Sequence, residues 1–190
     1  DLNGVIVSST GIVGSEFGLA LNSSGYDGDG SVAVLMNGNI VSAYIEEVSG
    51  TYRAAARITS PTGGAISTPL LSSGAASEPD VAALADGNFV AVWTEGANIN
   101  YRIYNSVGTA VTSVLTVAVT ADSENEPSVV GLPQGGFAIV WDNDTSGGLL
   151  AQAFTNAGVA DGSAVTIATD TTTPTVSVTS DGRLIFTWQD

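Results

Sequence analysis

Three reactive side chains are missing from this chain of 190 residues, which contains no cysteine, no histidine and no lysine. The lack of cysteine excludes disulfides and thiol chemistry. The other two absences remove the commonest general base and the amine that forms Schiff bases. Together they argue against an enzyme, although two carboxylates alone can still hydrolyse a glycosidic bond.

Positive charge is also scarce, because four arginines face 19 acidic residues and the formal net charge is −15. Such a chain repels nucleic acid and anionic membranes and attracts cations. No apolar stretch approaches the roughly 18 residues of a membrane span, and no signal-like segment starts the sequence. We expect no nucleic-acid partner, no membrane insertion, and one domain covering residues 1–190.

One pattern of about fifteen residues occurs four times in the sequence. Its copies run from Gly30 to Tyr44, Pro79 to Trp93, Pro127 to Trp141 and Pro174 to Trp188. The turn glycines of the copies are 49, 48 and 47 residues apart, and they are Gly38, Gly87, Gly135 and Gly182. A period near fifty residues with no helical pattern is typical of a β-propeller.

Each copy has the composition of a β-hairpin. In the second copy VAALA and FVAVW flank Asp86-Gly87, a pair that suits a tight two-residue turn with positive φ at both positions. A second hairpin pattern follows each of the first three copies. The fourth copy has none, but residues 4–22 show the pattern of the missing hairpin.

These hairpins predict an all-β, four-bladed β-propeller with four antiparallel strands per blade. The N-terminal hairpin would complete the last blade and close the ring by pairing with the C-terminal hairpin, which hides exposed sheet edges. A sandwich or open solenoid of the same hairpins is the alternative. The predicted blades cover residues 30–72, 79–120, 127–169, and 174–190 together with 4–22.

The pattern PxVAALxDGxFVxVW, together with GSEFxLxxNSS at Gly14 to Ser24, resembles a known repeat. It is similar to the propeller-like repeats, about fifty residues long, of secreted RTX-type calcium-binding exoproteins and adhesins of bacteria. The first copy departs from the pattern, with Gly30 for the leading proline and Tyr44 for the tryptophan. The resemblance implies an extracellular or cell-surface location, a calcium-rich setting, and a role in adhesion or a surface structure.

The acidic residues gather in the loops that a propeller would place on one face. The predicted loops between blades and between the two hairpins of a blade hold 15 of the 19 acids. One interpretation is a solubilising surface. The other is a face that collects cations, because clustered carboxylates raise one another's pKa unless a cation neutralises them.

Two acidic segments have the spacing of calcium ligands. Asp142, Asp144 and Ser146 match the first half of a D-x-D-x-S-G loop, and Asp27 and Asp29 form a shorter fragment. The bidentate acid that would end such a loop is absent, since Ala153 stands there. Calcium at these residues is the cofactor prediction, and a flexible acidic loop without metal is the alternative.

The aromatic residues divide into two groups. Four of them recur at one repeat position, which favours packing between blades over stacking against sugar; these are Tyr44, Trp93, Trp141 and Trp188. The tyrosines outside this pattern are better candidates to face a ligand, and they are Tyr26, Tyr52, Tyr101 and Tyr104.

We therefore predict a non-enzymatic, extracellular binding or assembly module, supported by calcium through its acidic loop face. Its partner at that face would be a protein or a glycan, or the module would assemble with itself. The alternative is a lectin that binds carbohydrate in clefts between blades. A third hypothesis is a hydrolase with two carboxylates near the axis.

Overall fold

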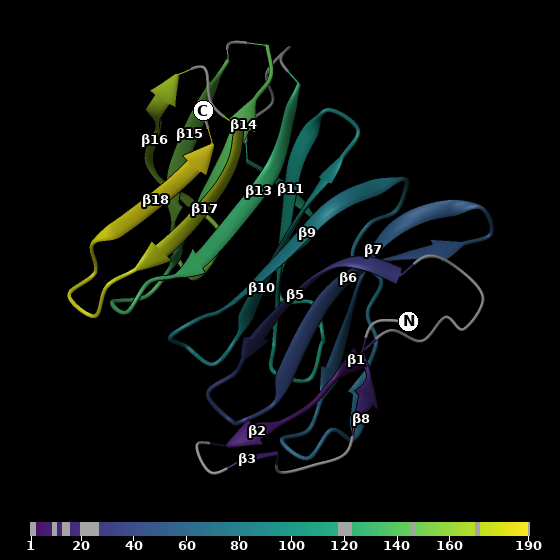
Figure 1. Cartoon of the computed structure of the whole chain (residues 1–190). Coiled ribbons are helices and arrows are strands. Elements are labelled where there is room, and N and C mark those ends of the chain that lie inside the picture. Colours follow the sequence, from purple (N-terminus) through teal and green to yellow (C-terminus); the bar gives the residue numbers. More distant parts are fainter. Residues whose placement is uncertain are drawn as a thin grey trace.

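The structure is a computed structural model that describes residues 3–8, 11–12, 16–19, 27–117, 123–145, 147–169 and 172–189. The regular secondary structure of these residues consists of β-strands alone. None of them belongs to a helix long and apolar enough to cross a membrane. Three sheets have four antiparallel strands each, and the other strands form three pairs (Figure 1). The predicted all-β class and the sheet of four antiparallel strands are confirmed.

The three complete sheets follow one another along the chain, and we call them blades 1, 2 and 3. Blade 1 contains β5 (Asp27–Val34), β6 (Ile40–Val48), β7 (Thr51–Thr59) and β8 (Ala65–Ser67). Blade 2 contains β9 (Ala76–Ala83), β10 (Phe89–Glu95), β11 (Asn98–Tyr104) and β12 (Leu115–Thr116). Blade 3 contains β13 (Glu124–Gly131), β14 (Phe137–Asn143), β15 (Gly148–Phe154) and β16 (Ala160–Thr169).

The two ends of the chain contain only strand pairs. They are β1 (Asn3–Gly4) with β4 (Phe17–Gly18), β2 (Val7–Ser8) with β3 (Gly11–Ile12), and β17 (Thr172–Val178) with β18 (Leu184–Gln189). Ring closure requires β18 to pair with the strand around Val7, but in the described part of the chain β18 pairs with β17. Figure 1 shows β1 and β18 well apart. The blade count and the closure of the ring are therefore not confirmed.

The first hairpin of each repeat turns at its glycine, although not by the predicted two-residue turn. In blade 2 the Leu84 N–H donates to the Asn88 carbonyl (2.9 Å) and the Gly87 N–H donates to the Leu84 carbonyl (3.1 Å). Gly87 has φ = 88°, whereas Asp86 is not among the residues with positive φ. This is a type I turn closed by a left-handed glycine, and the Asp86 carboxylate supports it by accepting the Asn88 N–H (3.0 Å).

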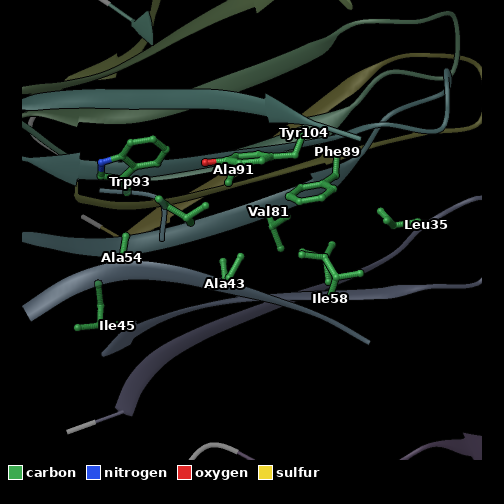
Figure 2. Close-up of a cluster of buried hydrophobic side chains, with 13 residues drawn as sticks. Leu35, Ala43, Ile45, Ala54, Ile58, Val81, Phe89, Ala91, Trp93 and Tyr104 are labelled. Carbon is green, nitrogen blue, oxygen red and sulfur yellow. The ribbon is translucent and has the colours of Figure 1, made fainter. Parts of the chain in front are cut away.

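Apolar side chains of facing blades form the core. Figure 2 shows the cluster between blades 1 and 2, where Phe89 and Trp93 pack with side chains of blade 1. Trp141 lies in a second cluster between blades 2 and 3. Trp93 and Trp141 are fully buried, as predicted, but Trp188 on β18 is 43% exposed. Its prediction as a core residue is wrong, because among the described residues no third strand pairs with β17 and β18 to extend this sheet.

Candidate active site

The first strand of each sheet carries the same irregularity near its start. In β5, β9, β13 and β17 the pairing register shifts by a β-bulge. One residue in each bulge is left-handed although it is not glycine, with φ between 50° and 55°, and these residues are Asp29, Glu78, Glu126 and Thr173. A left-handed backbone is strained for any residue other than glycine. Here it recurs at one repeat position, and strained backbone of this kind is typical of functional sites.

The four bulges meet at one open cavity of about 310 Å³, which we call the central cavity. Each bulge contributes the left-handed residue and the residue after it, so that the lining is Asp29, Gly30, Glu78, Pro79, Glu126, Pro127, Thr173 and Pro174. Because β5, β9, β13 and β17 lie next to one another (Figure 1), residues almost fifty positions apart converge there. The cavity therefore holds three carboxylates and one hydroxyl.

Two of these carboxylates also join neighbouring blades. Oε2 of Glu78 accepts the backbone N–H of Glu126 (2.7 Å) and the hydroxyl of Thr94 (3.0 Å). Oε2 of Glu126 accepts the N–H of Thr173 (2.6 Å). These bonds hold the carboxylates in one orientation and satisfy N–H groups that the bulges remove from the strand ladder.

A second row of contacts lies two residues further along the same strands. Asp80 accepts the N–H of Val129 in blade 3 (2.8 Å) and the hydroxyl of Ser31 in blade 1 (2.5 Å). Ser128 accepts the N–H of Val176 (3.4 Å). The walls of the central cavity are thus tied across blades by side chains, which stabilises the position of each bulge.

In the sequence these acids belong to the predicted acidic loop face, and only Asp29 is a predicted site residue. The signal was present: an acid or threonine directly precedes the leading glycine or proline of every copy. Its importance depends on the left-handed backbone and on the convergence of the bulges, which no single copy reveals.

The predicted calcium ligands Asp142 and Asp144 lie at the end of β14. Asp142 is 3% exposed and faces Asn125 across the β13–β14 ladder, and the Asn125 amide donates to Asp144 (2.8 Å). Burial raises the pKa of the Asp142 carboxyl, the negative charges of Asp144 and Glu126 raise it further, and the Asn143 N–H opposes them. The residue of blade 2 that corresponds to Asp142 is Thr94, whose hydroxyl donates to Glu78. Blade 3 instead has two carboxyl groups at these positions, those of Asp142 and Glu126.

This cluster offers part of a calcium shell. Oδ1 of Asp142 and Oδ1 of Asn125 are buried and have no hydrogen-bond partner, and a hard cation prefers such oxygens. However, no three histidine, cysteine or acidic side chains of the described residues stand close enough together to hold a metal. Ser146 and the side chain of Asp27 lie outside the described residues, and Asp29 lines the central cavity. Calcium binding remains a prediction.

Comparison with known proteins places the fold. No protein-family model and no curated protein matches the sequence. Solved structures do match it. An α-L-arabinofuranosidase of Podospora anserina, in complex with cellotriose, is 12% identical over 91% of this chain and 71% of that chain, with a TM-score of 0.54. An endo-arabinase of Bacteroides thetaiotaomicron is 11% identical over 94% and 75%, with a TM-score of 0.55.

A further similar structure is the catalytic domain of the Coprinopsis cinerea GH62 α-L-arabinofuranosidase, 14% identical over 99% of this chain and 72% of that chain, with a TM-score of 0.55. At such identities the likeness shows the fold alone, which is of the β-propeller type. The resemblance to RTX-type repeats and the predicted extracellular location remain predictions.

These neighbours correct the functional prediction. The chain was predicted to be a non-enzymatic, calcium-supported module, and the similar structures are glycoside hydrolases instead. The lack of histidine, cysteine and lysine argued against an enzyme, but it does not exclude one that works with carboxyl groups. Glycoside hydrolysis needs only carboxyl groups, and the central cavity has three.

Proposed function

We propose that this chain is a glycoside hydrolase that holds its carbohydrate in the central cavity. The observation that carries the proposal is the convergence of Asp29, Glu78 and Glu126, from one repeat position, on that cavity. A glycosidase uses one carboxyl group to protonate the leaving oxygen and a second as nucleophile or base. The likeness to arabinofuranosidases and an arabinase supports carbohydrate as the substrate class.

The hydrogen bonds of the site define which atoms would act. Glu78 and Glu126 each use Oε2 to accept N–H groups, and those bonds restrict rotation of the carboxylate. The other oxygen, Oε1, is then the atom of each group that would face a glycosidic bond. Fixed orientation of this kind lowers the entropic cost of reaching the transition state.

A hydrolysis assay on arabinan, xylan, arabinoxylan and nitrophenyl glycosides tests the proposal. We expect activity on at least one of them, and a loss of about 10²–10⁴-fold in kcat for a variant that removes an acting carboxyl group. The variants are Glu78→Gln, Glu126→Gln and Asp29→Asn, which keep a hydrogen-bond acceptor. Asp86→Asn, on an exposed turn of blade 2, is the matched control. Absence of any hydrolysis, or full activity in all three variants, would refute the proposal.

We also propose that the N-terminal strands complete the blade that β17 and β18 begin. The repeat pattern assigns residues 4–22 to the missing hairpin of that blade. The N-terminal segment already lies beside blade 1, where it borders a cavity of about 370 Å³ together with Val32, Val34 and Ile40. Pairing of β18 with this segment would cover exposed apolar residues on both sides, among them Val7 and Ile185.

Cysteine pairs test closure directly, because the natural chain has none. Val7→Cys combined with Thr187→Cys should form an intramolecular disulfide under mild oxidation. Val7→Cys combined with Val159→Cys, on an exposed turn of blade 3, should not. Equal cross-linking of the two pairs, or of neither, would count against closure.

A further inference from the structure

Two more cavities lie between blades 1 and 2, and one of them borders the central cavity at Asp29. The first, of about 330 Å³, is lined by Asp29, Ile45, Tyr52, Ala76 and Ser77. The second, of about 350 Å³, is lined by Tyr52, Ala75, Ala76, Ser77, Thr94 and Gly96. We call them together the side groove. It shares the lining residue Asp29 with the central cavity, so Tyr52 and the three carboxylates border neighbouring cavities.

Tyr52 is unusual among the tyrosines of the described chain. Tyr44, Tyr101 and Tyr104 are buried in the core, whereas Tyr52 is 50% exposed and borders both cavities of the side groove. Of the tyrosines outside the repeat pattern, Tyr101 and Tyr104 are therefore core residues, and Tyr26 lies outside the described residues. Tyr52 offers an aromatic surface to a ligand.

The position of Tyr52 results from a local departure of blade 1 from the repeat. The β10–β11 ladder ends at Glu95 and Asn98, which correspond to Glu46 and Arg53 of the β6–β7 ladder. Blade 1 continues for two further pairs, the first of which is Glu47 with Tyr52. Ser49 (φ 54°) and Gly50 (φ 78°) then close the hairpin with two left-handed residues. This tight turn holds the extension, so Tyr52 is presented on a regular strand.

The composition of the groove suits a sugar chain. Tyr52, Ile45 and Ala76 are the apolar residues of its lining, with Tyr52 the most exposed of them, and Ser77 and Asp29 provide hydrogen-bonding groups. A sugar ring has an apolar C–H face and a polar rim of hydroxyl groups. Aromatic side chains pack on such faces, while a few polar groups at the side set the orientation of the ligand.

We infer that the side groove binds the continuation of a linear oligosaccharide whose reacting unit occupies the central cavity, with Tyr52 packing on one sugar ring. This inference rests on the proposed function and narrows its substrate class to unbranched chains of several sugar units. A substrate limited to one or two units would leave the groove empty. The longer hairpin of blade 1 then has a role that the hairpins of the other blades do not share.

Calorimetric titration with linear arabino-, xylo- and cello-oligosaccharides, from disaccharides to hexasaccharides, tests the inference in a carboxylate variant that has lost hydrolysis. With Tyr52 intact we expect affinity to increase with chain length. Tyr52→Ala should weaken binding of the long oligosaccharides about tenfold and leave the disaccharides unchanged, whereas Tyr52→Trp should retain the dependence on length. Val107→Ala, at an exposed site in blade 2, is the control for loss of apolar surface.

The outcomes distinguish failure of the side-groove inference from failure of the proposed glycoside hydrolase function. If oligosaccharides bind and the carboxylate variants lose hydrolysis, but Tyr52→Ala behaves as the unmodified protein, the side groove is wrong and the proposed function stands. If Tyr52→Ala weakens all lengths equally, Tyr52 belongs to the central cavity and the extended groove is refuted. If no oligosaccharide binds or is hydrolysed, both proposals fail.

Discussion

The carboxylate of Glu78 accepts a hydrogen bond from the backbone N–H of Glu126, over 2.7 Å and across 48 residues of sequence. Glu126 repeats this relationship with the N–H of Thr173 at 2.6 Å. Glu78 therefore joins blade 2 to blade 3, and Glu126 joins blade 3 to β17. Both acids also line the central cavity. The groups that we propose to act on a substrate also help to hold the fold together.

Replacement of Glu78 should separate these two roles. Glu78→Ala leaves the Glu126 N–H and the Thr94 hydroxyl without their acceptor, which we expect to lower the free energy of unfolding by about 1–3 kcal/mol. Glu78→Gln keeps an acceptor oxygen and should cost less. Urea denaturation measures both values, and equal losses in the two variants would show that the hydrogen bonds do not matter.

Gly131 is required where blades 2 and 3 approach each other. A Cβ atom at this position would lie 2.0 Å from the backbone oxygen of Ala83. Gly131→Ala must therefore move one blade, and we expect a loss of about 1–3 kcal/mol, typical of overpacking. Gly74→Ala is a suitable comparison, because the nearest atom to its Cβ would be a side-chain oxygen, Oε1 of Glu95 at 3.1 Å, and not the backbone. Thermal denaturation should show a clear drop for Gly131→Ala only.

The three tryptophans should respond differently to a soluble quencher. Iodide should reach the half-exposed Trp188 and leave Trp93 and Trp141 emitting, and Trp188→Phe should abolish most of the quenching. Trp93→Ala and Trp141→Ala should each cost about 3–5 kcal/mol, whereas Trp188→Ala should cost much less. Quenching of all three residues to the same degree would contradict the described packing.

Asp142 should make stability depend on pH. Its pKa is raised in the folded chain by burial and by Asp144 and Glu126, so the folded state retains a proton that the unfolded state releases. The resulting stability is present below the ordinary pKa of an aspartate and is lost as pH rises through the folded-state value. Asp142→Asn should remove this dependence.

Asp142→Thr provides a matched variant, because it introduces in blade 3 the hydroxyl that Thr94 donates to Glu78 in blade 2. It should also lack the part of the pH dependence that Asp142 contributes. The measurements compare urea midpoints at several pH values in buffer containing a chelator. The same slope in all three proteins would contradict the assignment to Asp142.

Calcium at the same cluster is tested by melting in chelator and in millimolar calcium. A cation that only the folded chain binds stabilises it by about 2.7 kcal/mol at a hundredfold excess over Kd. The predicted shift should disappear when Asp142→Asn and Asp144→Asn are combined. Coincident melting curves of the unmodified protein in chelator and in calcium would show that this cluster does not bind calcium.

Much of the fold could be predicted because its signals are local. A hairpin depends on a few adjacent residues, such as the apolar strands on either side of Asp86-Gly87, and the same signals recur at a nearly constant period. The turn type was predicted wrongly, because Asp86 and Gly87 suit both a two-residue turn and a type I turn closed by glycine. The repeat position correctly predicted that Trp93 and Trp141 are buried, but it wrongly predicted the same for Trp188. A repeat position does not tell whether a neighbouring blade is present to cover the side chain.

The sequence by itself determined that this protein is all-β, that its sheets contain four antiparallel strands, and that carboxylates dominate its charge. These properties depend on residue composition and on contacts between neighbours in the chain. Only the tertiary structure decided that Asp29, Glu78 and Glu126 meet at one cavity and that Tyr52 borders a neighbouring cavity, which shares Asp29 with the first. Residues almost fifty positions apart meet only when the blades pack side by side, and the direction of each side chain depends on a left-handed bulge that the sequence pattern alone does not specify.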